Sequence, residues 1–155
     1  MSHEKIGDVQ VEQGDLAAAL TSYHASLAIR DRLAKADPGN AGWQRDLSVS
    51  HNKIGDVQRA QSDVAAALTS YQASLAIADR LAKADPGNAG WQRDLALSYG
   101  RAALIQVQQG VRDEALKRLQ RGREIIVQLI RRSPNSANLP KDLAWFDSQL
   151  DTYEK

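Results

Sequence analysis

Histidines and repeated carboxylates are the residues of this chain whose types could do chemistry. The chain holds three histidines, of which His3 and His51 lie 48 residues apart in matching surroundings, while His24 has no counterpart. A protein-bound metal needs two or more such ligands on one face, as in a His-Glu-x-x-His helix, and that spacing is absent. Asp8 and Asp56 also recur singly, and not as the pair that acid–base catalysis uses. We therefore expect neither a metal site nor catalysis.

Other catalytic and cofactor motifs are missing from the sequence as well. It contains no Gly-rich phosphate loop, no nucleophile elbow and no Ser/His/Asp arrangement, so we expect no enzyme activity and no cofactor. It contains no cysteine, which excludes a disulfide framework, Cys-ligated zinc and thiol catalysis. The composition, 43% apolar and 25% charged with a net charge of +1, is typical of a globular protein and gives no overall case for a nucleic-acid partner.

Membrane and targeting signals are also absent from the sequence. No apolar run approaches the length that spans a bilayer, and Met1 is followed by Ser-His-Glu-Lys and not by a basic and then apolar segment. We therefore expect a cytoplasmic protein without a membrane partner.

A long internal repeat organises the chain. Residues 2–47 recur as residues 50–95, a period of 48, with seven differences between the copies. A fixed period of this size is typical of stacked-repeat proteins, in which no unit buries its apolar face alone. The differing pairs are Glu4/Asn52, Val11/Arg59, Glu12/Ala60, Gly14/Ser62, Leu16/Val64, His24/Gln72 and Arg30/Ala78.

Each copy is predicted to be a helical hairpin. From Trp43 to Gln61, apolar or small residues recur in alternating steps of four and three, the spacing of one helix face. Asn40 is a suitable N-cap for this helix. Gln13-Gly14-Asp15 predicts a turn in which Gly14 takes a left-handed backbone and Asp15 caps the next helix, which should run to about Ala36.

A third, more divergent copy keeps the same period. Pro134 follows Pro86 by 48 residues and Leu143 follows Leu95, which predicts a hairpin over 91–109 and 112–132 and a last helix from about Pro140. The expected fold is all-α, a right-handed superhelical α-solenoid of seven helices in one domain, 1–155. Its repeats should cover about 2–38, 41–86 and 89–134, followed by a terminal helix at about 139–153.

The repeat resembles the tetratricopeptide repeat at the turn between its paired helices. That family has an aromatic residue, Leu-Gly, a later Ala, an aromatic four residues on and a closing Pro. The second copy matches with His51, Ile54-Gly55, Ala67 and Tyr71. The family period is about 34 residues, and seven extra residues in each helix, about two turns, account for 48. The resemblance is therefore to an elongated variant, in which His51 is a packing residue.

Small residues within the helices support close helix pairing. A glycine inside a helix costs about 1 kcal/mol relative to alanine, so Gly7 and Gly55 require a reason. The expected reason is close approach of the paired helix at Ala19 and Ala67.

The resemblance implies a concave groove lined by the first helix of each repeat, where a peptide or protein segment would bind. Glu4 and Asp8 stand where some members hold a C-terminal carboxylate with Lys and Asn, so that mode is disfavoured. The groove should be acidic at one end, mixed in the middle and apolar at the other. The apolar strip of that end, bordered by Arg93 and Arg101, suits a helix or extended segment of acidic, hydrophobic character. The predicted partner-binding residues are Asp8, Arg45, Asn52, Asp56, Arg59, Arg93, Leu97, Arg101, Leu104, Val107 and Trp145.

Two other functions remain open from the sequence. The first helix starts at Ser2 and lacks the equivalents of Trp43 and Leu47, which leaves the following helix partly uncovered. The chain could therefore form a homodimer through this incomplete repeat, or be an assembly element of a larger array. The basic helix 112–132 could contact nucleic acid, but acidic residues interrupt its charge. Substituting Leu104 and Asn52 should abolish partner capture if the groove binds the partner, and leave partner capture unaffected if the chain is an assembly element.

Overall fold

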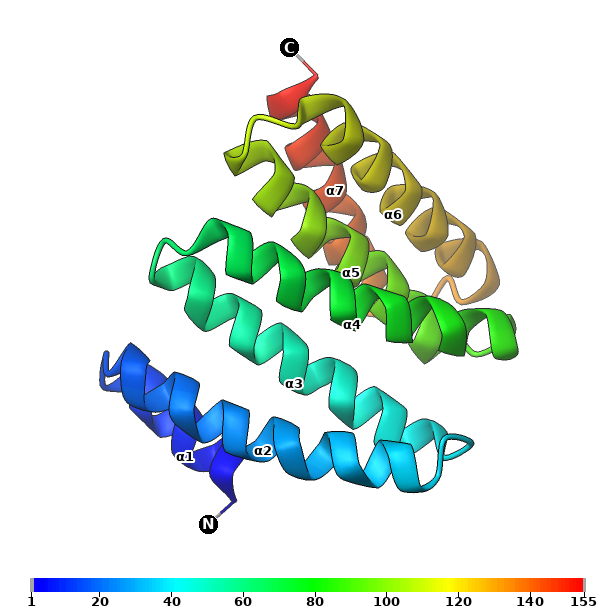
Figure 1. The fold of residues 1–155 in the computed structure, drawn as a ribbon. Coiled ribbons are helices and arrows are strands. Elements are labelled where there is room, and N and C mark those ends of the chain that lie inside the picture. Colours follow the sequence, from blue (N-terminus) through cyan, green and yellow to red (C-terminus); the bar gives the residue numbers. More distant parts are fainter. Residues whose placement is uncertain (1, 155) are drawn as a thin grey trace. The chain divides into compact units, whose positions relative to one another are not determined.

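The computed structural model describes residues 2–154, all in helices and short connections. Seven helices follow one another in the described residues, and no strand occurs there (Figure 1). They are α1 (His3–Glu12), α2 (Leu16–Ala36), α3 (Ala41–Ala60), α4 (Val64–Ala84), α5 (Ala89–Gln108), α6 (Arg112–Arg132) and α7 (Leu139–Tyr153). The predicted all-α fold class of consecutive helix pairs is confirmed.

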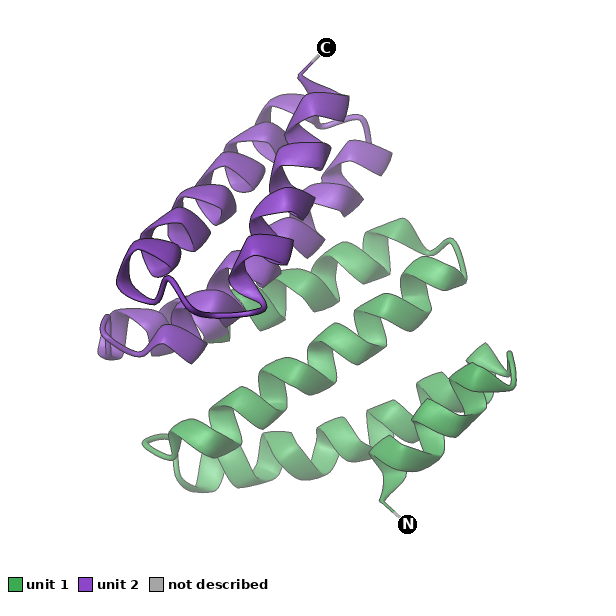
Figure 2. Ribbon diagram, turned by 180° about the vertical axis from the view of Figure 1, so that it is seen from behind, with its two compact units in different colours: residues 1–77 green, residues 78–155 purple. Residues whose placement is uncertain are grey.

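The chain forms two compact units, residues 1–77 and 78–155, whose boundary lies within α4 (Figure 2). In the first unit α1 packs on α2, and α2 packs on α3. In the second unit α5 packs on α6, and α6 packs on α7. Each unit therefore buries its apolar side chains between antiparallel neighbours.

The helix starts follow the capping residues that the sequence offers. Asn40 accepts a hydrogen bond from the backbone N–H of Trp43 at 3.0 Å, and Asn88 accepts one from Trp91 at 3.0 Å. Asp15 accepts one from the N–H of Ala18 at 3.1 Å. Because these side chains satisfy donors that the first helical turn leaves unpaired, α2 and α3 begin directly after the predicted caps Asp15 and Asn40, and α5 begins directly after Asn88.

The turns between paired helices use a left-handed backbone. Gly14 has φ 76° and Gly110 has φ 80°, whereas the second copy has Ser62 there, at φ 64°. A side chain in this conformation costs about 1 kcal/mol relative to glycine. The prediction for Gly14 is confirmed, and Ser62 carries a strain that its counterpart avoids.

Replacing Ser62 with glycine should therefore raise the free energy of unfolding by up to about 1 kcal/mol. The reciprocal change, Gly14→Ser, should lower it by a similar amount, because it places the same side chain in the same turn of the first copy. Urea denaturation followed by circular dichroism measures both. If Ser62→Gly and Gly14→Ser had the same free energy of unfolding, the proposed strain at Ser62 would be contradicted.

The mid-helix glycines make room for tyrosine rings. A Cβ added at Gly7 would lie 2.5 Å from Cε1 of Tyr23, and one added at Gly55 would lie 2.6 Å from Cε1 of Tyr71. The close approach predicted for these positions exists, but the expected contacts with Ala19 and Ala67 were wrong as its cause. The atoms nearest to each missing side chain belong to the tyrosine four residues further along the paired helix.

Candidate functional site

A hollow of about 400 Å³ opens between α5 and α7 in the second unit. Leu97, Arg101 and Leu104 come from one face of α5, where steps of four and three place side chains in a row. From α7 come Trp145 and two residues of its first turn, Lys141 and Asp142. The structure thus brings four predicted partner-binding residues together: Leu97, Arg101, Leu104 and Trp145.

The indole of Trp145 is held in place by its contacts with Gly100 and Phe146. A Cβ added at Gly100 would lie 2.8 Å from Cζ3 of Trp145, so only glycine lets the ring lie this close to α5. The indole also meets Phe146 edge to face, with ring centroids 5.0 Å apart and an interplanar angle of 85°. Edge-to-face packing favours one ring orientation. Trp145 is therefore a pre-oriented wall of the hollow.

Arg93, which was also predicted to bind a partner, joins α5 to α7. Its Nε donates to Oδ2 of Asp142 at 2.7 Å and its Nη2 donates to Oδ1 at 3.2 Å, a two-pronged ion pair. These hydrogen bonds raise the pKa of Arg93, although its partial burial opposes the shift. The pair fixes the start of α7 beside α5 and neutralises Asp142.

Lys141 is the hollow's exposed cation. Its side chain makes no ion pair with any residue in the described range 2–154. Arg101 adds a second positive charge to the lining, while the carboxylate of Asp142 is occupied by Arg93. The arrangement offers an apolar surface with positive charge at its rim, which suits an apolar side chain next to a carboxylate.

Val107 and the predicted residues of the first unit lie elsewhere. Val107 is half-buried and packs against the core of the second unit. In the first unit Arg45 and Arg59 are exposed on α3. Asn52 is half-buried, and its Oδ1 has no hydrogen-bond partner among residues 2–154. Asp56 accepts a hydrogen bond from the hydroxyl of Tyr71.

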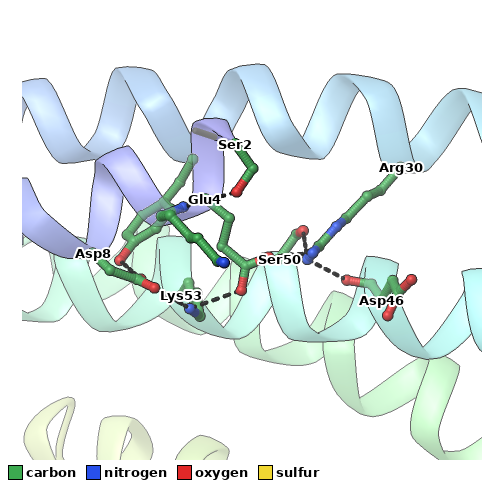
Figure 3. A network of polar contacts seen from close by, with 9 residues as sticks. Ser2, Glu4, Asp8, Arg30, Asp46, Ser50 and Lys53 are labelled. Carbon is green, nitrogen blue, oxygen red and sulfur yellow. Dashed lines mark hydrogen bonds and ion pairs between the residues drawn. The ribbon is translucent and has the colours of Figure 1, made fainter.

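The acidic residues of α1 belong to a charge network with α2 and α3. The ammonium of Lys53 lies 2.8 Å from Oε1 of Glu4 and 2.8 Å from Oδ1 of Asp8. Arg30 pairs with the other oxygen of Glu4, and its Nη1 donates to Oγ of Ser50 at 2.8 Å. Figure 3 shows both carboxylates directed at Lys53. The groove end expected to be acidic is therefore largely neutralised.

The hydrogen bonds of this network shift the pKa values of its members. Burial raises the pKa of Glu4 and of Asp8, but hydrogen bonds from Lys53 and its charge outweigh burial, so both pKa values lie below their usual range. Burial likewise lowers the pKa of Lys53, and its two carboxylate partners more than reverse this. Asp8 also accepts from the hydroxyl of Tyr23 at 2.5 Å. Burial and Asp8 raise the pKa of Tyr23, so the hydroxyl keeps its proton.

Acid should weaken the first unit through these carboxylates. Since their folded pKa values are depressed, their stabilisation is present above a pH of about 4 and is lost as pH falls through the folded values. We expect Lys53→Met to lower the free energy of unfolding at pH 7 by about 1 kcal/mol, allowing for solvent screening. The variant should also lose less stability between pH 5 and 3.

Lys117→Met is the matched control, because Lys117 is 73% exposed and 3.7 Å from Glu114. It should change neither the stability at pH 7 nor the acid profile measurably. Thermal unfolding at several pH values measures both variants. An acid profile for Lys53→Met that parallels the unsubstituted chain would contradict a role for this network.

Two of the differences between the near-identical copies are explained by this network. Glu4 and Arg30 pair in the first copy, and their counterparts 48 residues on are Asn52 and Ala78, which cannot form an ion pair. The sequence reasoning took position 52 as a groove position and missed the link to position 30. The signal was present, because both members of the pair change together.

Three of the seven basic residues of α6 make contacts within the chain that the structure shows clearly. Arg123 pairs with Asp147, Nε of Arg112 donates to the carbonyl of Tyr153 at 2.7 Å, and Arg121 lies over the ring of Tyr99 with 5.9 Å to its centroid. Nucleic-acid binding generally needs a continuous basic stripe, whereas Asp113, Glu114 and Glu124 interrupt this one. These three side chains are bound within the chain. Contact of this helix with nucleic acid stays an untested prediction.

Histidine, metal and membrane features complete the description. Burial lowers the pKa of half-buried His51, as suits a packing residue. Residues 2–154 hold no group of three His, Cys, Asp or Glu placed to hold a metal ion. None of the helices described in that range is both long and apolar enough to cross a bilayer.

Among known proteins, a solved structure bears a weak likeness to this chain. No protein-family model matches this sequence, and no curated protein matches it. The solved structure of the first TPR of Spaghetti (RPAP3) bound to the HSP90 peptide SRMEEVD is similar, with a TM-score of 0.47 and 15% sequence identity. The match covers 96% of this chain and 93% of that chain. At that degree of likeness it bears on neither the ligand nor the site of this chain.

Proposed function

We propose that this chain is a protein-interaction module, an elongated tetratricopeptide-like repeat, whose α5–α7 hollow binds a segment of a partner protein. The observation that supports this proposal most directly is that Leu97, Leu104 and Trp145 line one open hollow with positive charge beside it. An aromatic wall, two leucines and nearby cations are the elements of a small binding hot spot. The bound segment would place an apolar side chain in the hollow and a carboxylate near Lys141.

The divergence of the third copy supports a binding role at this place. Leu104 occupies the position of Asp8 and Asp56, so an aspartate row of the first two copies ends in leucine. Leu104 is half-buried in the hollow and does not belong to the fully buried core. An apolar side chain that stays partly exposed beside Trp145 contributes less to folding than a buried one, and its exposed surface is available to a ligand.

A selection from a displayed library of random peptides tests this proposal, because it requires no natural ligand to be identified first. Selected peptides should combine Leu, Phe or Trp with a neighbouring Asp or Glu. Leu104→Asp, which restores the residue of the other copies, should weaken their binding at least about tenfold, since it places a charge in the apolar hollow. Lys141→Met should reduce the salt dependence of binding, because it removes the rim cation.

Val111→Asp is the matched control for the charge change. Val111 is 42% exposed and caps α6 without a side-chain hydrogen bond, and the other copies have Asp15 and Asp63 at its position. This variant should bind the selected peptides as the unsubstituted chain does. Equal binding by Leu104→Asp in isothermal titration would refute the proposed site.

The alternative role as an assembly element concerns the first unit. The sequence predicts a homodimer or a longer array at the incomplete first repeat. Three exposed apolar side chains there, Val9, Ile29 and Leu33, favour a contact surface at this place.

A further inference from the structure

An apolar strip on α2 lies where α1 does not reach. Ser22 donates to Oε1 of Gln10 on α1 at 2.7 Å, which places Ser22 on the face of α2 that α1 covers. Ile29 and Leu33 follow on the same face, because the steps 22, 26, 29 and 33 keep to one side of a helix. They are 41% and 38% exposed. Figure 1 shows α1 lying along only the first part of α2.

The other copies show what covers this strip when the repeat is complete. Ile77 in the second copy is 5% exposed and Leu129 in the third is 3% exposed, while the other two counterparts, Leu81 and Ile125, are half-buried. Helices α3 and α5 have 20 residues each and α1 has 10. In the second unit Gln92 and Leu95, from the first half of α5, line hollows with Ile125 and Leu129. The covering element is thus the leading half of a repeat's first helix.

The outer side of α1 is bare in the same way. Val9 is 40% exposed, whereas its counterpart Val57 is 3% exposed and packs with Ala19, Tyr23 and Ile54 between α2 and α3. Both valines stand in the same segment, Lys-Ile-Gly-Asp-Val-Gln, so the difference in exposure follows from the neighbouring helix. Val9 therefore lacks a neighbour like the second helix of a preceding repeat, whereas the Ile29–Leu33 strip lacks the leading half of a first helix.

We infer that the strip of Ile29 and Leu33 is a docking site for the leading helix of another repeat of this kind, presenting Trp and Leu four residues apart. The chain holds two examples of such a helix, with Trp43 and Leu47 in α3 and with Trp91 and Leu95 in α5. Both leucines are buried within this chain, at 8% and 6% exposure, so a second copy has no such helix to offer. The site is separate from the α5–α7 hollow.

The probe is the chain's own covering segment. A helix of about a dozen residues is marginal when isolated, so it is best tethered, which raises its effective concentration to the millimolar range. The sequence of residues 38–49, including the cap Asn40, is placed directly before Ser2 in place of Met1. Ser2 matches Ser50, so the register of α3 is reproduced in front of α1.

The extended chain should unfold about 5 °C higher than the original chain, since a Trp and a Leu cover Ile29 and Leu33. Two variants of the extended chain test whether docking causes the gain. Alanine at both the added Trp and the added Leu should remove most of the gain. Leu33→Gln should remove it as well, while changing the unextended chain little because Leu33 is already exposed.

Several results would overturn the inference. One is an extension that leaves the unfolding midpoint unchanged, and another is a gain that survives loss of the added Trp and Leu. Light scattering of the unextended chain should show a monomer up to about 1 mM. A dimer that dissociates on Leu33→Gln would mean that the strip binds a second copy of the chain instead. Peptide binding at the hollow should be equal in both chains, so failure here and failure of the proposed function are distinguishable.

Discussion

Replacing Phe146 with alanine should lower the free energy of unfolding of the second unit by about 3–5 kcal/mol, the usual cost of emptying a large buried aromatic site. Phe146 is 0% exposed and lies in a core with Leu119, Ile126 and Leu150. The ring fills a notch in α6, since a Cβ added at Gly122 would lie 2.5 Å from its Cε1. Few atoms can move into the vacated space, because the notch is formed by the helix backbone at Gly122, which has no side chain to shift.

The same change should also weaken ligand binding, because Trp145 loses the ring that orients it. Urea denaturation followed by tryptophan fluorescence, with Trp91 and Trp145 reporting on this unit, measures the stability loss. Val111→Ala, at a 42% exposed site, is the control and should cost under about 0.5 kcal/mol. A loss below about 1 kcal/mol for Phe146→Ala would show that the notch collapses around the smaller side chain.

Local signals in the sequence were enough to predict the helices. The caps Asp15 and Asn40 act within three residues along the chain, so their effect depends on spacing alone. The left-handed turn at Gly14 is equally local. Leu97 and Leu104 were predictable neighbours because their spacing fixes one helix face, and Trp145 was predictable because the 48-residue period makes it the counterpart of Leu97.

Side-chain direction and long-range ion pairs were beyond the sequence. Gly7 was assigned to the wrong neighbour because spacing places helices side by side and leaves open which ring lies between them. Lys53 joins Asp8 across 45 residues, and Arg93 joins Asp142 across 49. A flexible side chain has several acceptors within reach, so such pairs need the packed arrangement, or a coordinated change such as Glu4/Asn52 with Arg30/Ala78.

Replacing Gly55 with alanine should cost about 1–3 kcal/mol, although alanine favours helices by about 1 kcal/mol. The added Cβ would lie 2.6 Å from Cε1 and 2.8 Å from Cδ1 of Tyr71. Tyr71 is 1% exposed and its hydroxyl is bound to Asp56, so the ring cannot swing aside. Overpacking therefore outweighs the gain in helix propensity.

The third copy shows the set of changes that should relieve this clash. At the positions of Gly55, Asp56 and Tyr71 it has Ala103, Leu104 and Leu119, and Ala103 and Leu119 are both 0% exposed. We expect Tyr71→Leu alone to be destabilising because it leaves a cavity and removes the bond to Asp56. The Gly55→Ala/Tyr71→Leu double variant should lose at least about 1 kcal/mol less than the sum of its single changes, since the new methyl group occupies space the ring has left.

Ala103→Gly is the matched control for the pairing of glycine with tyrosine. It should cost about 1 kcal/mol, the ordinary helix penalty, because Leu119 gains nothing from the extra space. A double-mutant cycle in urea measures the coupling at positions 55 and 71. If the two losses simply add, the glycine and the tyrosine are independent, and the changes in the third copy have another cause. If they couple, the same exchange also explains why the third copy has Leu104 where the second has Asp56. Asp56 accepts a hydrogen bond from the Tyr71 hydroxyl, and the third copy has Leu119 in place of that tyrosine. Without the hydroxyl, an aspartate at position 104 would have no such donor, and an apolar side chain can take its place in the hollow.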